Sequence, residues 1–479
     1  MRSYTALAAG IVFLFVILVL VVVAGQVHWG TGMCGLAFIN HTEYTLSPEY
    51  SGCRNTTASR FLPDQGAWWY YWRLPNPTAG SRAFVWFSYI AHQVAAWLTQ
   101  YYAQARMKNE DGEAPKYSTT LRRFNFQMLA VHGFFHGLHL VQTHTTYDGL
   151  HGDVSFQSSQ ASVIALLGVV FAMEAPGRGM FLGIPSHRGL SKAGLYVARK
   201  YHGYFFNWAA IWTFWCHPME PMWGFLLGFS HTGLLMLQGS LMYTDAHKNR
   251  YWRFVLESWV TLHASIIAKQ TMPGWEMFFF GFMLLFCAMQ VPGLPFMRDM
   301  HIIIRLAPLV CYIAGLAGWW AVTRGGGGNV AVMGLLGIPI AEWLVAYGVT
   351  FVFWCIFHPK LGIGRGSSKV GGVLIFLIST ALVAIFGALD WYIPYNAWLA
   401  DPTVTPKGMI LSYPGTAIAL IGMVWGMCML LGGPPKELYS SAGCCADCCG
   451  AVEEDDETAA KGQRQVEMIA AGSAAAPDM

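Results

Sequence analysis

The chain has 479 residues, of which 55% are hydrophobic and only 11% are charged, and its formal net charge is +3. Soluble domains carry roughly 25% charged residues, so this composition excludes an ordinary soluble protein. The small net charge gives no electrostatic footprint for nucleic acid. Several apolar runs reach the roughly 20 residues that are needed to cross a bilayer. The sequence predicts an all-α, polytopic integral membrane protein of the secretory pathway or plasma membrane.

In chain order, twelve segments are apolar enough to be predicted as transmembrane helices. They are 6–25, 83–103, 124–144, 160–177, 203–217, 222–243, 253–270, 275–292, 302–322, 331–357, 370–393 and 409–431. A tight turn at 217–221 separates the fifth segment from the sixth.

The distribution of basic residues orients these segments. If the N-terminus is cytosolic, the cytosolic loops 104–123 and 178–202 carry five Lys or Arg residues each, whereas the outside loop 145–159 carries none. Short cytosolic loops are enriched in Lys and Arg. The even number of spans then returns the C-terminus to the cytosol, so both termini are predicted to be cytosolic.

The first span is predicted to be a retained signal anchor. Its apolar run of about 20 residues exceeds the 7–15 of a signal-peptide core. The alternative is a signal peptide cleaved after Ala24. The predicted organisation is a first helix, a lumenal loop, a His-rich bundle, three further helices and a disordered tail, at 1–25, 26–82, 83–322, 323–434 and 435–479.

The lumenal loop has the features of an oxidising compartment. Asn40 and Asn55 begin glycosylation sequons. Cys34 and Cys53 lie in the same loop and could form a disulfide.

The C-terminal tail contains a cysteine cluster followed by an acidic run. We predict that its cysteines are S-palmitoylated because they follow the last span closely; a small metal site is the alternative. They are Cys444, Cys445, Cys448 and Cys449.

Histidines are concentrated in the third span, where residues 131–144 read VHGFFHGLHLVQTH. His132, His136 and His139 recur at intervals of four and three, which places them on one helix face. Neighbouring histidines on this helix face could share a metal ion, so all three are predicted metal ligands. Ionisable residues inside a membrane are costly and usually functional.

Three further histidines are predicted at similar depth in other spans. His92 is in the second span, His231 in the sixth and His263 in the seventh. We predict that these three contribute to binding a cofactor. Imidazole can ligate iron, copper or haem, relay protons, or hydrogen-bond a neighbouring helix, and all three roles remain open.

Acidic residues add candidates for catalysis or transport. Glu257 is in the seventh span, with Arg253 one turn away as its predicted salt-bridge partner. His217 and Glu220 are at the outer turn, and these two residues together with Glu257 are the catalytic candidates. Glu342 is a further acid, within the tenth span.

Three functions are therefore considered. The leading hypothesis is a metal- or haem-dependent membrane oxidoreductase whose substrate is lipid-soluble or an electron carrier. The second is a proton-coupled multi-pass transporter that uses the same histidines for a proton or ion path. The third is a receptor-like or scaffolding membrane protein in which the histidines only pack. The chain has no P-loop and no dinucleotide fingerprint, so nucleotide-driven chemistry is not predicted.

Overall fold

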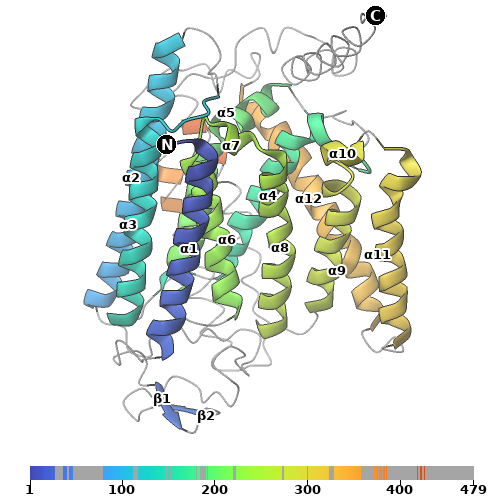
Figure 1. Cartoon of the computed structure of the whole chain (residues 1–479), viewed down its shortest axis with the longest axis horizontal. Helices are drawn as coiled ribbons and strands as arrows, with labels where there is room; N and C mark the ends of the chain where they lie inside the picture. Colours follow the sequence, from blue (N-terminus) through green and yellow to red (C-terminus); the bar gives the residue numbers. More distant parts are fainter. Residues whose placement is uncertain are drawn as a thin grey trace, which may run out of the picture.

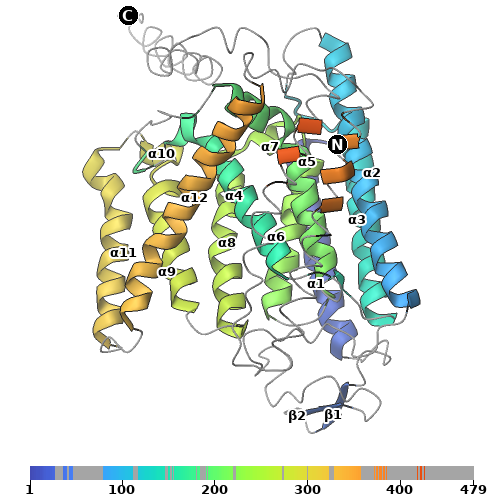
Figure 2. The same cartoon turned by 180° about the vertical axis from the view of Figure 1, so that it is seen from behind.

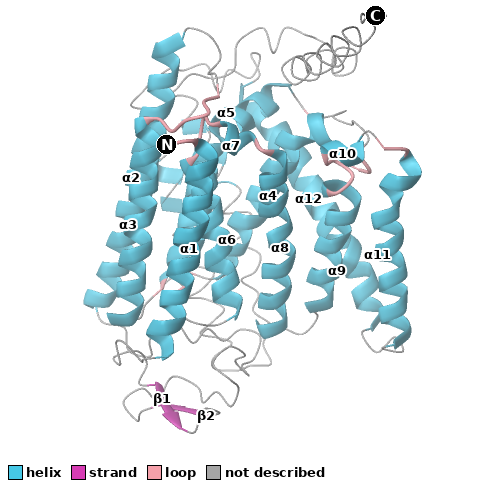
Figure 3. Cartoon of the chain, viewed as in Figure 1, coloured by secondary structure: helices cyan, strands magenta, loops and turns pink. Residues whose placement is uncertain are grey.

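The computed structural model is mainly helical, with one short antiparallel ribbon (Figure 3). It describes residues 1–26, 36–39, 43–46, 79–111, residues 117–357 with short gaps in the connections, and scattered positions between 372 and 426. The ribbon pairs Leu36 with Leu46 and lies within the predicted lumenal loop. The helical content agrees with the predicted all-α class.

The helices stand side by side as a bundle (Figure 1). Their bounds are α1 Ser3–Gln26, α2 Ala79–Asp111, α3 Arg123–Thr145, α4 Phe156–Arg178, α5 Lys192–Cys216, α6 Trp223–Ser240, α7 Asp245–Lys248, α8 Arg250–Thr271, α9 Trp275–Leu285, α10 Pro295–Arg298, α11 Ile302–Val322 and α12 Gly328–Phe357. The strands are β1 Leu36–Ile39 and β2 Glu43–Leu46, and α9 continues into a π-helical turn, η3, at Phe286–Gln290. Seen from behind, α9, α11 and α12 form one side of the bundle and α2 and α3 the other (Figure 2).

Each of the first ten predicted spans overlaps one of these helices. The last two, 370–393 and 409–431, lie largely outside the described residues. The clearest difference is α5, which begins at Lys192, eleven residues before the predicted span at 203–217. The added turns contain Lys and Arg, so a search for apolar runs misses them although they are helical.

The number of transmembrane helices is only partly supported. Three described helices are long and apolar enough to cross a membrane: Ser3–Ala24, Ala161–Arg178 and Ile302–Val322. Glu276–Gln290 and Leu336–Val352 are apolar but shorter. The predicted count of twelve is therefore not confirmed.

Helix α2 shows why average hydropathy is low in several other helices. Four large apolar side chains in its middle turns are exposed: Phe87, Ile90, Val94 and Leu98. Its buried side chains are in large part polar: Ser88, His92, Gln93 and Gln100. This is the reverse of a helix on a soluble protein, whose apolar stripe faces the core.

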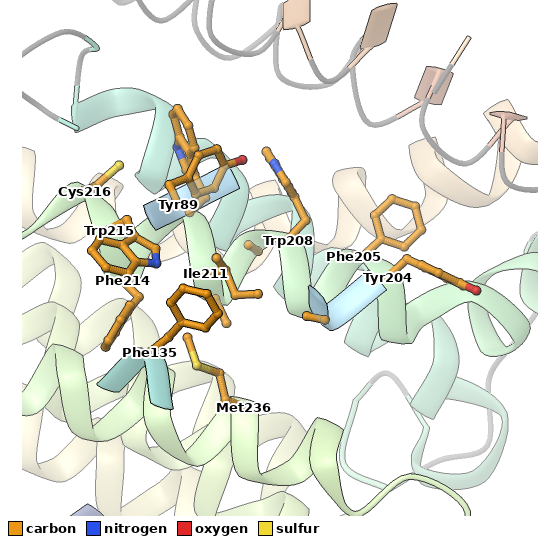
Figure 4. Packing of buried hydrophobic residues seen from close by; sticks show 14 of the residues in the cluster. Tyr89, Phe135, Tyr204, Phe205, Trp208, Ile211, Phe214, Trp215, Cys216 and Met236 are labelled. Carbon is orange, nitrogen blue, oxygen red and sulfur yellow. The ribbon is translucent and has the colours of Figure 1, made fainter. Parts of the chain in front are cut away.

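An aromatic core lies between α2, α3, α5 and α6 (Figure 4). Trp208, Trp212 and Trp215 of α5 are almost completely buried, with exposed fractions of 1%, 1% and 0%. Tyr89 of α2 meets Trp212 edge-on, with ring centroids 5.2 Å apart. Buried aromatic rings contribute large apolar areas, and this packing fixes α5 against the histidine-bearing helices.

The end of the bundle that carries α7 is tied together by backbone hydrogen bonds. The amide of Ser3 donates to Thr119 O, and that of Asp245 donates to Ser118 O. Asn125 donates from Nδ2 to the carbonyls of Ser240 and Met242, at 2.8 and 2.9 Å. The starts of α1 and α3 and the end of α6 are therefore held in fixed register.

Candidate functional site

A hydrogen-bonded pair of histidines joins α2 to α3. His92 Nε2 lies 2.9 Å from His132 Nδ1, and both residues are buried. The His92 ring also stacks on Phe135, with centroids 4.3 Å apart and an interplanar angle of 12°. The imidazole of His92 is thus held on one face by an aromatic ring and at one edge by His132.

Trp215 sets the tautomer of this pair. Its indole Nε1–H donates to His92 Nδ1 at 3.1 Å. An indole nitrogen can only donate, so a neutral His92 carries its proton on Nε2 and donates it to His132 Nδ1. His132 then carries its own proton on Nε2. These protons are assigned from the chemistry of the partners, and the pair is polarised from Trp215 through His92 to His132.

His136 presents the opposite nitrogen. Its Nδ1–H donates to the His132 carbonyl at 2.7 Å, because a carbonyl only accepts, so Nε2 carries a lone pair. Within the described residues, Nε2 of His132 and Nε2 of His136 are both buried without a hydrogen-bond partner. Leaving a buried polar atom unpaired costs about 1–3 kcal/mol. One turn of α3 therefore offers an N–H donor and a bare lone pair in apolar surroundings.

Helix α6 approaches His136 through a glycine. A Cβ atom at Gly233 would lie 3.3 Å from His136 Nε2. The His136 ring also contacts Phe214 of α5, with centroids 4.7 Å apart, and Phe13 of α1, with centroids 6.3 Å apart. The lone pair of His136 is therefore close to the α6 backbone and screened by aromatic rings.

His139 joins α3 to the end of α5 and the turn that follows it. Its Nε2 lies 2.6 Å from the His217 carbonyl and 3.0 Å from the Phe214 carbonyl. Its Nδ1 lies 3.0 Å from the Gln142 side-chain amide. Because Nε2 donates to carbonyls, Nδ1 accepts, and the Gln142 amide is therefore assigned with its NH2 group donating to Nδ1. Both ring nitrogens are engaged, so His139 links α3 to the turn after α5. His217 contributes its backbone oxygen to this link, and its own ring stacks on Phe225.

His231 and His263 form a second pair, between α6 and α8. Their ring centroids are 5.9 Å apart at an interplanar angle of 68°. A Cβ atom at Gly228 would lie 2.9 Å from His263 Nε2, so a glycine again lets an imidazole approach α6. The six predicted histidines thus form a group on α2 and α3 and a pair between α6 and α8.

No metal-binding cluster of the usual size is found in the part of the chain that the structure describes. There, no group of three or more His, Cys, Asp or Glu side chains is arranged to hold an ion. A site made by two protein ligands falls outside that criterion.

Glu257 has a different partner from the one predicted. It pairs with Arg178 of α4 and accepts a hydrogen bond from Gln290 Nε2 at 3.2 Å. Arg253 pairs instead with Glu174 of α4. The predicted Arg253–Glu257 pair is therefore wrong: each of the two α8 side chains pairs with an opposite charge on α4, and neither pairs with the other along α8.

Of the other predicted residues, Glu342 is described by the structure. Its side chain is 2% exposed, and its Oε2 atom has no hydrogen-bond partner within the described residues. The remaining predicted residues lie outside the described residues: Glu220, Asn40, Asn55, Cys34, Cys53, Cys444, Cys445, Cys448 and Cys449.

Trp215 and Gly233 were not identified from the sequence. Trp215 is one of 20 tryptophans, and nothing in its spacing distinguishes a hydrogen-bond donor to a histidine from a packing residue. Gly233 is one of 52 glycines, and only the approach of His136 marks it.

Comparisons with known proteins give no relative for this chain. No family model matches it. No curated protein and no solved structure matches it either. Its function must therefore be argued from the site alone.

Proposed function

We propose that the chain is a polytopic membrane protein in which His92, His132 and His136 relay protons, and that it acts as a proton-coupled transporter. The observation that carries this proposal is the polarised hydrogen-bonded series from Trp215 through His92 to His132. Histidine suits this role because its unperturbed pKa lies close to physiological pH.

The exposed surface supports a position in the membrane. Three of the described helices are long and apolar enough to span it. Helix α2 turns apolar side chains such as Phe87 and Leu98 outward while His92 and Gln93 are buried. An ionisable residue in a membrane usually faces the interior of the bundle, and the histidines of α2 and α3 do so.

The relay transfers one proton in three bond exchanges. When the Trp215 indole moves away, His92 Nδ1 takes up a proton. The proton on His92 Nε2 passes to His132 Nδ1 along the existing hydrogen bond. The proton on His132 Nε2 passes to His136 Nε2 after a ring movement that brings the two atoms together, because neither has a hydrogen-bond partner in this structure. His136 then holds the added proton as an imidazolium, and His92 and His132 are left with their protons on Nδ1. The starting tautomers return when each of these two rings loses its Nδ1 proton and is protonated again at Nε2. Release from His136 is directed toward α6 at Gly233.

The same tautomers argue against His132 as a metal ligand. A metal on His132 Nε2 would require the proton on Nδ1, facing His92 Nε2. His92 already accepts from Trp215 at Nδ1, so both of its nitrogens would be acceptors and the ring would be an imidazolate. His139 has both nitrogens engaged. Among His132, His136 and His139, it is His136 that has a bare lone pair.

Proton flux into liposomes tests the relay. Purified protein would be reconstituted with an internal pH-sensitive dye, and the external medium acidified. We expect wild-type protein to acidify the interior, and His136→Gln and His132→Gln to reduce the rate at least tenfold. His301→Gln is the matched control, because His301 is exposed. Equal rates in wild type and His136→Gln would contradict the proposal.

A redox centre is the second candidate function, supported by the unpartnered lone pair of His136. An optical spectrum and the iron and copper content of the purified protein test it. A Soret band, or iron or copper at one atom per chain that is lost in His136→Gln, would favour the oxidoreductase over the transporter. A colourless protein without iron or copper would remove this candidate.

A further inference from the structure

Two histidines outside the relay face each other at the end of the bundle that carries α7. His202 belongs to α5 and lies just before the predicted span at 203–217, and His247 belongs to α7. Their ring centroids are 5.9 Å apart at an interplanar angle of 34°. Both are partly exposed, so the pair is accessible from the medium.

Each of these rings has its tautomer fixed by a backbone carbonyl. His202 Nδ1–H donates to the Arg199 carbonyl at 2.6 Å. His247 Nδ1–H donates to the Gln238 carbonyl at 2.8 Å. A carbonyl only accepts, so the Nε2 atom of each neutral ring carries the lone pair. Histidines that bind metals commonly donate their other N–H to a backbone carbonyl in this way.

The orientation of His247 is reinforced by Gln238. The Gln238 side chain donates from Nε2 to the His247 carbonyl at 2.9 Å. Its Oε1 accepts a hydrogen bond from Trp252 Nε1 at 2.7 Å. Helix α7, which carries His247, is therefore held in place before any ligand arrives, and this lowers the entropy lost on binding.

The spacing of the rings fits one shared ion. Zinc–nitrogen bonds are about 2.0–2.1 Å long, so two imidazoles on one tetrahedral ion have ring centres roughly 5–6 Å apart. The observed 5.9 Å falls in this range. Imidazole suits zinc, copper and nickel, whereas oxygen ligands suit magnesium and calcium.

The charged groups around the pair come from three helices. Glu174 of α4 acts on His202, Arg253 of α8 acts on both rings, and Lys248 of α7 acts on His247. Burial, followed by the neighbouring His202, lowers the pKa of His247 to about 3. Burial also lowers the pKa of His202.

We propose that His202 and His247 form a zinc site at this end of the bundle, with water completing the coordination. Glu174 supplies an oxygen ligand if its carboxylate is exchanged from Arg253. Because α5 and α7 each contribute one ligand, the bound ion links the helix that carries Trp215 to the segment that connects α6 and α8. This site is independent of the proposed proton relay.

Zinc titration of the purified full-length protein in detergent tests the site. We expect wild-type protein to compete with a chromogenic chelator for one equivalent of zinc at pH 7. His202→Ala and His247→Ala should each weaken this binding at least tenfold, and His301→Ala should leave it unchanged. Unaltered zinc affinity in both variants, or no competition by wild-type protein, would overturn the proposal.

A spectroscopic measurement that counts the nitrogen ligands distinguishes the loss of one ligand from the loss of the folded structure. Cu²⁺ added to wild-type protein should give an electron paramagnetic resonance signal with hyperfine splitting from two nitrogen ligands, and His202→Ala should give splitting from one. Thermal unfolding without metal identifies any variant that fails to fold. A wild-type signal with no nitrogen splitting would contradict the two-histidine site.

Discussion

Trp215 controls which nitrogen of His92 is available, and through it the proton positions of two residues. Its indole N–H occupies His92 Nδ1, which is the atom at which the proposed relay would take up a proton. A single buried hydrogen bond fixes the tautomer of the pair and, in the proposed relay, blocks the atom that receives the proton. Strengthening or removing this bond should change the rate of proton uptake without changing the other relay atoms.

Replacing Trp215 with Phe tests this role. The Phe ring keeps most of the packing but donates no hydrogen bond, so His92 Nδ1 is left open to a proton. We expect proton uptake into liposomes to be several-fold faster than in wild type. Trp212→Phe is the control, because Trp212 is equally buried on the same helix but donates to Ser158 Oγ at 3.2 Å instead. Slower uptake in Trp215→Phe than in Trp212→Phe would show that the indole is not a barrier.

His247 predicts a pH dependence of stability. Burial lowers its pKa in the folded protein to about 3, below the usual histidine pKa of about 6.5. Between these two pH values the unfolded chain binds more protons than the folded chain. Stability is therefore lost as the pH falls below about 6.5, by at most about 1.4 kcal/mol per pH unit for this group. In buffer with a zinc chelator, thermal unfolding at pH 7 and pH 5 should show a larger loss for wild type than for His247→Asn. An equal loss would mean that His247 is protonated in the folded protein.

At the scale of elements, two ion pairs cross between α4 and α8. Glu174 and Arg178 are one turn apart on α4, and Arg253 and Glu257 are one turn apart on α8. The pairs differ in burial: the side chains of Arg178 and Glu257 are 10% and 9% exposed, and those of Arg253 and Glu174 are 29% and 23% exposed. Two Arg–Glu ion pairs therefore join the same two helices, and one pair is more deeply buried than the other.

The difference in burial predicts a difference in stability. Glu257→Gln leaves the buried guanidinium of Arg178 without its counter-charge, which costs about 3–5 kcal/mol for a buried pair. Glu174→Gln breaks a pair that water and salt partly screen, so its cost should be nearer 1 kcal/mol. Thermal unfolding of the two variants in detergent measures this order. The idea fails if Glu174→Gln is the less stable protein.

The sequence predicts the positions of helices better than it predicts which side chains form hydrogen bonds and ion pairs with one another. Apolar runs locate α1–α6, α8, α9, α11 and α12. They miss the first turns of α5, where Lys and Arg are helical outside an apolar run. Spacing on α3 places His132 and His136 on one face, but it says nothing of Trp215 on another helix. Spacing along α8 likewise predicts Arg253 as the partner of Glu257. The observed partner, Arg178, belongs to α4, and spacing within one helix gives no information about residues of another helix.

At the scale of the whole molecule, the two ends of the bundle differ in chemistry. The end with the N-terminus carries α7 and α10, and the β1–β2 ribbon lies at the opposite end (Figure 1). The first of these ends carries the basic segments, including Arg122, Arg199 and Lys248. The positive-inside rule assigns such an end to the cytosol. The proposed zinc site would then face the cytosol.

This orientation gives a prediction for glycosylation. If the ribbon end is lumenal, Asn40 and Asn55 enter the compartment where sequons are modified. Expression in a eukaryotic cell should therefore give a protein whose gel mobility increases on treatment with an N-glycosidase, and Asn40→Gln together with Asn55→Gln should abolish that shift. A peptide tag placed after Met479 should be reached by antibody only after the plasma membrane is permeabilised. A tag that is accessible on intact cells would contradict a cytosolic C-terminus. Such a result requires either an odd number of spans or the opposite orientation of the whole bundle. Glycosylated sequons together with an accessible tag indicate an odd number of spans, whereas unmodified sequons together with an accessible tag indicate the opposite orientation.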